Sequence, residues 1–249
     1  MPAAIIAGSL IYEIPGMELK EKTVDTPYGK TLVYEVEGAR SEVVFLPRHG
    51  LDHDTPPHKI NYRANIKALE MLGVKRVLAA NAVGSINKQV APLELVVLSD
   101  FIDFTSNREA TFFDGGEQGV THVDVSTPYC PYLSQKLLHV AAKYDTCIHP
   151  RGVYVCTNGP RLESPAEIKM FDLLGGDVVG MTGLPEAVLA KELGLCYASV
   201  AFSINWAAGF QDTIEFTSDA EGLKKMQENL LNMLLETIAT TSDDQCCSE

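Results

Sequence analysis

The feature that most constrains this fold is the alternation, along the whole chain, of short apolar runs with helix-patterned segments. The runs Ala3–Ala7 and Cys196–Phe202 contain no charged residue, which is typical of strands buried on both faces. Further strands are predicted at Glu42–Pro47, Val74–Ala80, Leu93–Phe104, Gly152–Cys156 and Asp177–Val179, with a hairpin-like pattern over residues 12–41. Strands interleaved with helices favour an α/β architecture.

Helices are predicted between these strands. Apolar spacing indicates helices over Asn61–Leu72, around residues 133–144 and over Pro185–Leu193. Two more helices are predicted to begin at capping boxes, one formed by Ser164 and Glu167 and one by Ser218 and Glu221. We expect an α/β fold in a single domain spanning residues 1–249, with a central mixed β-sheet flanked by helices and a polar tail from about residue 240.

Charge and composition exclude several classes of function. The formal net charge of −13 argues against non-specific nucleic-acid binding, which needs a basic surface. No apolar run approaches the roughly 20 residues of a membrane span, and the N-terminus lacks the basic region of a signal peptide. The six cysteines show no metal-type spacing, so we expect a reduced, cytoplasmic protein without a metal. Cys246 and Cys247 are interpreted as part of a frayed tail, with redox activity as the alternative.

Polar residues recur where the predicted strands end. They are Ser9, Arg48, His49, Asn81, Glu163, Thr182 and Asn205. Ligand contacts in α/β proteins gather at the carboxyl ends of strands, so this recurrence predicts one site. Arg48 has a planar fork suited to phosphate oxygens, and His49 beside it adds a second donor. Hydroxyls of Ser9 and Thr182 and the backbone amide of Ala82 would complete an anion site. Taken alone, Arg48-His49-Gly50 also fits a surface turn, and Asn205 an amide that only bonds its own turn.

Longer segments resemble the trimeric branch of the purine nucleoside phosphorylase family, including its methylthioadenosine phosphorylases. In chain order they are RHGLDHDTPPHKINYRAN (48–65), NAVGS (81–85), FIDFTSNREATFFDG (101–115), THVDVSTPYCP (121–131), TNGPRLESPAE (157–167), GMTGLPEAVLAKELGLCYAS (180–199) and SINWAAG (203–209). The resemblance implies the family's fold and its reaction, in which phosphate attacks the anomeric carbon of a purine nucleoside. Inorganic phosphate is then a co-substrate, and no cofactor is implied.

The resemblance also implies roles for individual residues. Phosphate would contact Ser9, Arg48, His49, Ala82 and Thr182. Met181 would pack against the ribose and Leu162 against the purine. His53 and His122 would lie near the sugar 5′ position, with His122 entering from a neighbouring subunit of a homotrimer or a dimer of trimers.

Base specificity follows from counting donors and acceptors. A 6-oxopurine has an acceptor at O6 and a donor at N1. Asn205 can donate to O6 while its carbonyl accepts the N7 proton, and the Glu163 carboxylate can accept from N1–H. Adenine-selective relatives resemble this chain but have Asp at the position of Asn205, Ser at that of Glu163 and Asp at that of Ala207. We therefore expect a hypoxanthine-type base, with Asn205, Glu163 and His49 as the catalytic residues.

The segments are nearest the branch that cleaves methylthioinosine, and apolar Ile214 and Phe216 near the expected 5′ pocket fit a thioether. Methylthioinosine is the first substrate prediction, then inosine or guanosine, then methylthioadenosine. The alternative from another class is a purine-binding protein without turnover. A nicotinamide dehydrogenase is disfavoured because no GxGxxG follows the first strand. Two positions depart from the family or are distinctive: Leu10, where a glycine is usual, and Trp206, which could narrow the purine pocket.

Overall fold

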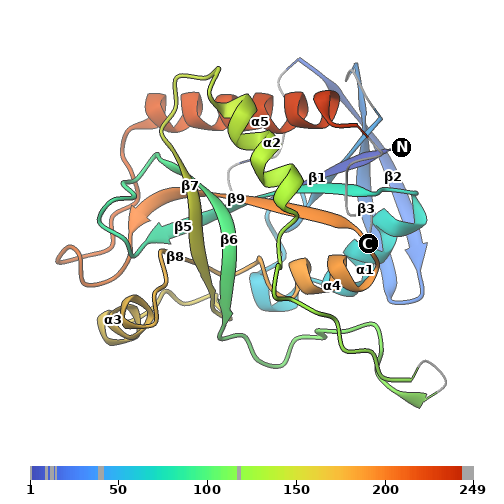
Figure 1. The fold of residues 1–249 in the computed structure, drawn as a ribbon, viewed down its shortest axis with the longest axis horizontal. Helices are drawn as coiled ribbons and strands as arrows, with labels where there is room; N and C mark the ends of the chain where they lie inside the picture. Colours follow the sequence, from blue (N-terminus) through green and yellow to red (C-terminus); the bar gives the residue numbers. More distant parts are fainter. Residues whose placement is uncertain are drawn as a thin grey trace.

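The chain folds around one nine-stranded mixed sheet (Figure 1). The computed structural model describes residues 2–8, 11, 14, 16–38, 42–116 and 119–242. The strands are β1 (Ala3–Ala7), β2 (Glu18–Thr26), β3 (Gly29–Glu37), β4 (Val43–Pro47), β5 (Arg76–Ser85), β6 (Leu95–Asp103), β7 (Ile148–Cys156), β8 (Val178–Gly180) and β9 (Cys196–Trp206). The helices are α1 (Tyr62–Met71), α2 (Pro131–Ala141), α3 (Pro165–Leu173), α4 (Glu186–Glu192) and α5 (Ala220–Thr240), with a 3₁₀ turn, η1, at Pro57–Lys59.

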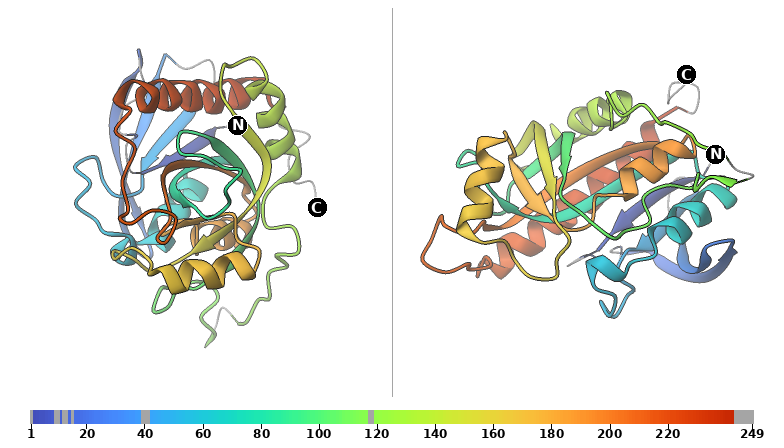
Figure 2. Two further views of the ribbon diagram at one scale, coloured as in Figure 1. Left: turned by 90° about the vertical axis from the view of Figure 1, so that its left-hand side faces the viewer. Right: turned by 90° about the horizontal axis from the view of Figure 1, so that it is seen from below.

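Part of the sheet closes on itself. The strand order is β2-β3-β4-β1-β5-β8-β7-β6-β9, and β9 also pairs with β5. β9 therefore lies between β6 and β5, antiparallel to the first and parallel to the second, and completes a ring with β8 and β7. The long strands β5 and β9 cross the molecule side by side (Figures 1 and 2). The prediction of a mixed sheet flanked by helices is confirmed, and its closure into a ring is a new finding.

Helices cover both faces of the sheet. On one face, α2 and α5 pack through Leu133, Leu137, Leu230 and Leu234 into one core. On the other, α1 and α4 pack through residues such as Ile66 and Leu189 into a second core. Among the described residues, no helix has the length and apolar character of a membrane span.

β9 shows how the sequence specifies this layering. Cys196, Ala198, Val200 and Phe202 face the α2–α5 core, whereas Tyr197 and Ala201 face the α1–α4 core. Alternate residues of a strand point to opposite faces, so a strand between two helical layers must be apolar at every position. The uncharged run predicted as a strand is therefore a strand buried on both sides.

One edge of β5 is left open near its middle. β1 pairs with β5 only as far as Ala79, and β8 pairs with it from Gly84 onward. Between these points no described strand pairs with the edge of β5 that lies opposite β9, and the Ala80 carbonyl on that edge accepts a hydrogen bond from Arg48. Alternate residues of a strand direct their backbone groups to the same edge, so the amide of Ala82 points the same way.

Strands β5 and β9 run well past the carboxyl ends that the sequence predicts. β5 continues through Ser85 and β9 through Trp206, because the two strands stay paired beyond a register shift at Val83/Gly84. Asn81 and Asn205 therefore lie within strands and not in the turns after them. The capping box at Ser164 is confirmed, with both reciprocal bonds to Glu167 present. The predicted box at Ser218 is wrong: the N-cap of α5 is Asp219, whose side chain accepts from the Gly222 amide at 2.8 Å.

The corrected cap gives a stability prediction. Asp219→Ala removes the acceptor of an otherwise unpaired helix-end amide and should lower the free energy of unfolding by about 1 kcal/mol. Ser218→Ala is the matched control and should leave it nearly unchanged. Urea unfolding monitored by circular dichroism measures both. A larger loss for the Ser218 variant would contradict the assignment of the cap.

Candidate active site

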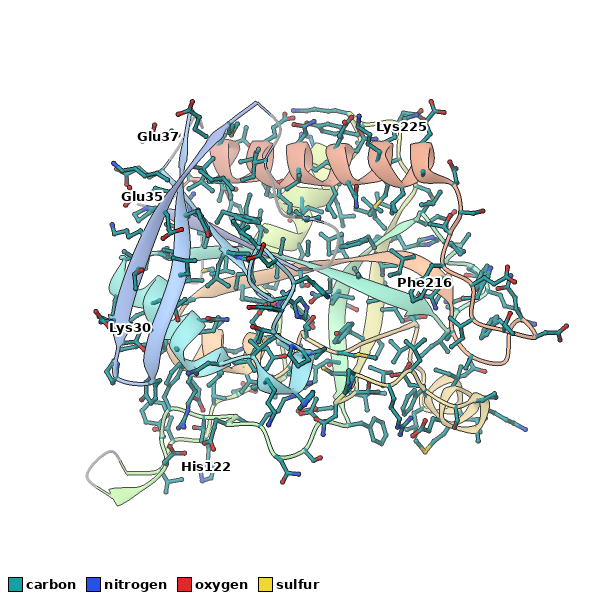
Figure 3. The ribbon with its side chains drawn as sticks, turned by 180° about the vertical axis from the view of Figure 1, so that it is seen from behind. Lys30, Glu35, Glu37, His122, Phe216 and Lys225 are labelled. Carbon is teal, nitrogen blue, oxygen red and sulfur yellow. The ribbon has the colours of Figure 1, made fainter. Side chains whose placement is uncertain are left out.

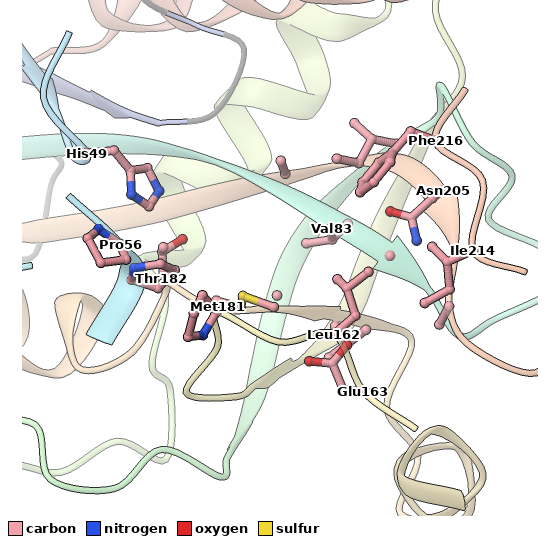
Figure 4. A pocket seen from close by; sticks show the side chains of 18 of the residues that line it. His49, Pro56, Val83, Leu162, Glu163, Met181, Thr182, Asn205, Ile214 and Phe216 are labelled. Carbon is pink, nitrogen blue, oxygen red and sulfur yellow. The ribbon is translucent and has the colours of Figure 1, made fainter. Parts of the chain in front are cut away.

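A cavity of about 510 Å³ opens beside the free edge of β5 and the ends of β7, β8 and β9 (Figure 4). It gathers ten of the twelve site residues that the sequence predicts: Arg48, His49, His53, Ala82, Leu162, Glu163, Met181, Thr182, Asn205 and Ala207. His49 and Thr182 lie at one end, and Asn205, Leu162 and Glu163 at the other, with Met181 between them (Figure 4). The cavity therefore has an Arg-His end and an acid-amide end.

Arg48 is buried and paired, which differs from the open fork that we predict from the sequence. Its Nε and Nη2 donate to the two carboxylate oxygens of Glu186 at 2.6 and 2.7 Å, and Nη1 donates to the Ala80 carbonyl at 3.1 Å. Burial alone would lower the pKa of Arg48, but the carboxylate of Glu186 outweighs that effect and raises it. Of the five guanidinium hydrogens, two remain for a ligand, one on each terminal nitrogen.

Tyr197 completes the network around this ion pair. Its hydroxyl donates to Oε1 of Glu186 at 2.7 Å from within β9. Burial and the neighbouring Glu186 raise the pKa of Tyr197 well above its ordinary value, so the hydroxyl remains a donor. A buried ion pair is stable only when its remaining lone pairs are bonded, and Tyr197 meets that requirement.

His49 is an acceptor at this site and not the second donor that we predict from the sequence. Its Nδ1 lies 2.8 Å from the Thr55 carbonyl, which can only accept, so Nδ1 carries the proton. Burial, together with the charge of Arg48, lowers the pKa of His49 to about 4 despite that bond. The ring is therefore neutral at pH 7, and Nε2 is left with a lone pair.

Thr182 is held by a chain of side-chain bonds. Its hydroxyl donates to Oδ1 of Asn81 at 3.0 Å, and Nδ2 of Asn81 donates to the hydroxyl of Ser199 at 2.7 Å. The Thr182 amide donates to the Tyr154 hydroxyl at 3.1 Å. These bonds fix the loop after β8, and with the Ala82 amide on the open edge of β5 they give the Arg-His end of the cavity a polar wall.

The acid-amide end presents the donor–acceptor pattern that we predict. Nδ2 of Asn205 donates to the Trp206 carbonyl at 2.8 Å, which leaves one N–H and the side-chain carbonyl available. Oε1 of Glu163 accepts from the Thr157 hydroxyl at 2.7 Å, which leaves the second carboxylate oxygen available. Both side chains point into the same end of the cavity (Figure 4).

Met181 and Leu162 contribute apolar side chains to the cavity wall. A Cβ on Gly159 would lie 2.4 Å from Sδ of Met181, and Gly159 has φ +61°. Only glycine allows both this backbone conformation and the close approach of the thioether. Leu162 is 41% exposed in the free cavity, so its side chain is available to a ligand.

Ser9 and Leu10 lie outside the described residues, as do Cys246 and Cys247. His122 is exposed on the long loop between β6 and α2 and does not line the cavity of its own chain (Figure 3).

Trp206, near the acid-amide end, is placed differently from our expectation. Trp206 stacks on Phe210 with ring centroids 5.4 Å apart, and it is not among the lining residues. Ile214 and Phe216 do line the cavity, but Phe216 forms a β-bridge with Asn205. Phe216 therefore lies beside Asn205 on the cavity wall.

Sequence reasoning missed the residues that orient the site from behind. Glu186 bonds to Arg48, and Tyr197 bonds to Glu186. Thr157 bonds to Glu163. Glu186 stands in the first turn of a predicted helix, where an acidic residue is already explained by the helix dipole. Its role as the partner of Arg48 becomes apparent only in the structure, where Glu186 is 1% exposed.

The cavity itself gathers no set of metal ligands among the described residues. The group of metal-ligating side chains that they do form, Glu94, Cys147 and His149, lies outside it. There Nε2 of His149 is 2.8 Å from Oε2 of Glu94, and that carboxylate oxygen also accepts from the Ala91 amide.

An α/β chain whose cavity joins an Arg-His end to an acid-amide end has the polar groups that an enzyme acting on a small oxyanion and a heterocyclic compound needs. Comparison with known proteins agrees with this class. The family model of the phosphorylase superfamily matches residues 2–239. The chain belongs to the phosphorylase superfamily.

Three similar proteins carry three different names. A probable 6-oxopurine nucleoside phosphorylase of Moorella thermoacetica is 48% identical over 96% of this chain and 92% of its own length. A probable S-methyl-5′-thioinosine phosphorylase of Methanocaldococcus jannaschii is 45% identical over 94% of this chain and 90% of its own. The structure of methylthioadenosine phosphorylase from Schistosoma mansoni with adenine superposes with a TM-score of 0.88 at 32% identity, covering 96% of this chain and 90% of that one.

The lowered pKa of His49 predicts an acid dependence of stability. The ordinary pKa is 6.5 and the folded value is about 4, so between these values the unfolded chain binds the proton more readily. The contribution of His49 is fully present above pH 6.5 and is lost as the pH falls toward 4. His49→Gln should therefore lose less melting temperature between pH 7 and pH 5 than the wild type. His139→Gln, on the exposed side of α2, is the control, and equal losses in all three proteins would contradict the prediction.

Proposed function

We propose that this protein catalyses the phosphorolysis of 6-oxopurine nucleosides, with S-methyl-5′-thioinosine as the preferred substrate. The observation that carries the proposal is that Asn205 and Glu163 lie together at one end of a cavity whose other end holds Arg48 and His49. The proposed products are hypoxanthine and 5-methylthioribose 1-phosphate. Inorganic phosphate is the co-substrate, and the chemistry requires no cofactor.

The phosphate would lie at the Arg48 end. The two remaining guanidinium hydrogens of Arg48 and the amide of Ala82 are donors for its oxygens. Two groups also present lone pairs there: Nε2 of His49, and the Thr182 hydroxyl, whose hydrogen is donated to Asn81. Each can accept a hydrogen bond from the proton that phosphate carries at neutral pH. Because Glu186 balances Arg48, phosphate keeps enough electron density to attack carbon.

The purine would lie at the Asn205 end. As phosphate oxygen bonds to the anomeric carbon, the bond from that carbon to N9 breaks and its electron pair moves onto the purine. The proton that phosphate brings balances the reaction and ends on the free base. The N–H of Asn205 stabilises charge developing at O6 while its carbonyl accepts from protonated N7, and Glu163 accepts from N1–H. Met181 borders the intervening space, where the ribose would lie.

The choice among substrates rests on two different observations. Asn205 and Glu163 match a 6-oxopurine. The relatives from Moorella thermoacetica and Methanocaldococcus jannaschii are both named for 6-oxopurine substrates. The apolar residues Ile214, Phe216 and Met181 on the wall favour a thioether over a hydroxyl at the 5′ position. Inosine or guanosine is the second candidate substrate, and methylthioadenosine, named for the superposed structure, is the third.

The assembly and the location of the protein complete the proposal. We propose a homotrimer, or a dimer of trimers, because His122 lies on an exposed loop outside its own cavity, where a neighbouring subunit can receive it. We place the reaction in the cytoplasm, where cysteines such as Cys147 and Cys156 would stay in the thiol form that they have in the structure.

A substrate panel tests the proposed activity. Purified protein is given methylthioinosine, inosine, guanosine and methylthioadenosine, and base release is followed with and without phosphate. We expect kcat/KM to decrease in the order in which these substrates are given, and we expect all turnover to require phosphate. Fastest cleavage of methylthioadenosine would overturn the base assignment, whereas fastest cleavage of inosine would overturn only the 5′ assignment. Nucleoside binding without any cleavage would favour a purine-binding protein.

Base selection by Asn205 gives a second test. Asn205→Asp replaces the donor to O6 by an acceptor, and one unpaired buried polar group costs about 1–3 kcal/mol. The ratio of kcat/KM for methylthioinosine to that for methylthioadenosine should fall about ten- to a hundred-fold. The ratio compares two substrates on the same variant. Any loss of folded protein caused by the missing bond to Trp206 therefore affects both values equally. Asn158→Asp, outside the cavity, is the control, and an unchanged ratio in Asn205→Asp would refute the assignment.

A further inference from the structure

Arg108 lies in the long loop between β6 and α2, and its guanidinium joins segments that build both ends of the cavity. We propose that Arg108 is a positioning residue that aligns the phosphate-binding segments with the base-binding segments. The inference rests on the proposed function, because it concerns the alignment of two substrates. Arg108 does not line the cavity, so its effect must pass through the residues that it holds.

One nitrogen of Arg108 joins the loops that follow β7 and β8. Nη2 donates to the Met181 carbonyl at 2.8 Å, to the Asn158 carbonyl at 3.1 Å and to the Thr157 carbonyl at 3.3 Å. Met181 and the adjacent Thr182 line the middle and the Arg-His end of the cavity. Thr157 orients Glu163 through its hydroxyl. The two loops that carry opposite ends of the site therefore meet at this nitrogen.

The other terminal nitrogen extends the clamp to two more segments. Nη1 donates to the Leu184 carbonyl and to the Tyr62 hydroxyl, the latter at 3.0 Å. Leu184 immediately precedes α4, which carries the Glu186 partner of Arg48. The Tyr62 hydroxyl in turn donates to the carbonyl of Pro57, a residue of the cavity wall, at 2.9 Å.

The chemistry of the clamp requires arginine. Among the described residues no carboxylate pairs with Arg108, and its acceptors are four backbone carbonyls and one phenol. The guanidinium also stacks on Tyr62, 5.2 Å from the ring centroid. A planar group with fixed donors can bind several carbonyls at once, whereas a lysine ammonium is a point charge with three donors. Nε of Arg108 is buried without a partner in the described part of the chain, which is a cost to stability that the clamp geometry imposes.

A specific kinetic effect follows. Each loop binds its own part of the substrates, so loss of the clamp leaves much of the binding intact. The reaction, however, needs the attacking oxygen and the anomeric carbon in line, and a misplacement of about 1 Å can lower a rate roughly a hundred-fold. Loss of Arg108 should therefore lower kcat much more than it raises KM.

The experiment compares Arg108→Ala and Arg108→Lys with the control Arg63→Ala. Arg63 also joins α1 to the long loop, through Glu109 and Asp114, but it contacts neither cavity loop. All proteins are assayed well below their melting temperatures, with rates corrected for the folded fraction. We expect kcat about a hundred-fold lower for Arg108→Ala, KM within about three-fold of wild type and Arg63→Ala near wild type. Guanidinium chloride at low, non-denaturing concentration should partly restore kcat of Arg108→Ala and not of Arg108→Lys, in which the space is filled.

Several results would overturn the proposal. One is a wild-type kcat in Arg108→Lys, and another is a kcat loss in Arg108→Ala that disappears after correction for the folded fraction. A third is an equal kcat loss in Arg63→Ala, and a fourth is the failure of guanidinium to restore kcat in folded Arg108→Ala. If Arg108→Ala does not fold, the kcat of Arg108→Lys against that of Arg63→Lys decides. If the wild type cleaves no nucleoside, the proposed function fails first. The inference about Arg108 rests on that function and is then overturned with it.

Discussion

The buried pair of Arg48 and Glu186 is the interaction on which the rest of the site depends. Both side chains are 1% exposed and joined by two short bonds, so neither charge has access to bulk water. Removing one partner of such a pair would leave a buried charge, at a cost of about 3–5 kcal/mol. The pair also joins the turn after β4 to α4, two segments 138 residues apart in the chain. The cation that a phosphate would meet is therefore fixed by the same contact that holds the fold together there.

The charge of the pair also explains how the cavity can hold both an anion and an acid. Arg48 is the permanent cation among the described lining residues, whereas Asp54 and Glu163 are carboxylates. With Glu186 behind Arg48 and with His49 neutral, the Arg-His end offers hydrogen-bond donors and lone pairs more than net positive charge. Such a site would recognise phosphate by the placement of its hydrogens more than by net charge.

Much of this could be predicted from local sequence, and the remainder depends on distant contacts. The apolar run Cys196–Phe202 indicates a doubly buried strand because alternation is local information. Pairing of β9 with both β5 and β6 depends on residues far away, so neither the ring closure nor the extension of β9 through Asn205 could be seen. The motifs around Arg48, Thr182 and Asn205 predicted which residues meet in one cavity. They did not predict that Thr55 would make His49 an acceptor or that Glu186 would occupy the fork of Arg48, because hydrogen-bond direction depends on the folded partners.

The position of Asn205 has a consequence for how this family can change its substrates. Asn205 lies on a strand paired along both edges over much of its length and is itself bridged to Phe216. A backbone held in this way has little freedom to shift, so a new purine cannot be accommodated there by remodelling a loop. Under the proposed function, divergence of base preference at this end would therefore proceed by exchange of side chains on a fixed backbone. Changes at the Arg-His end could instead occur through the loops after β4, β7 and β8.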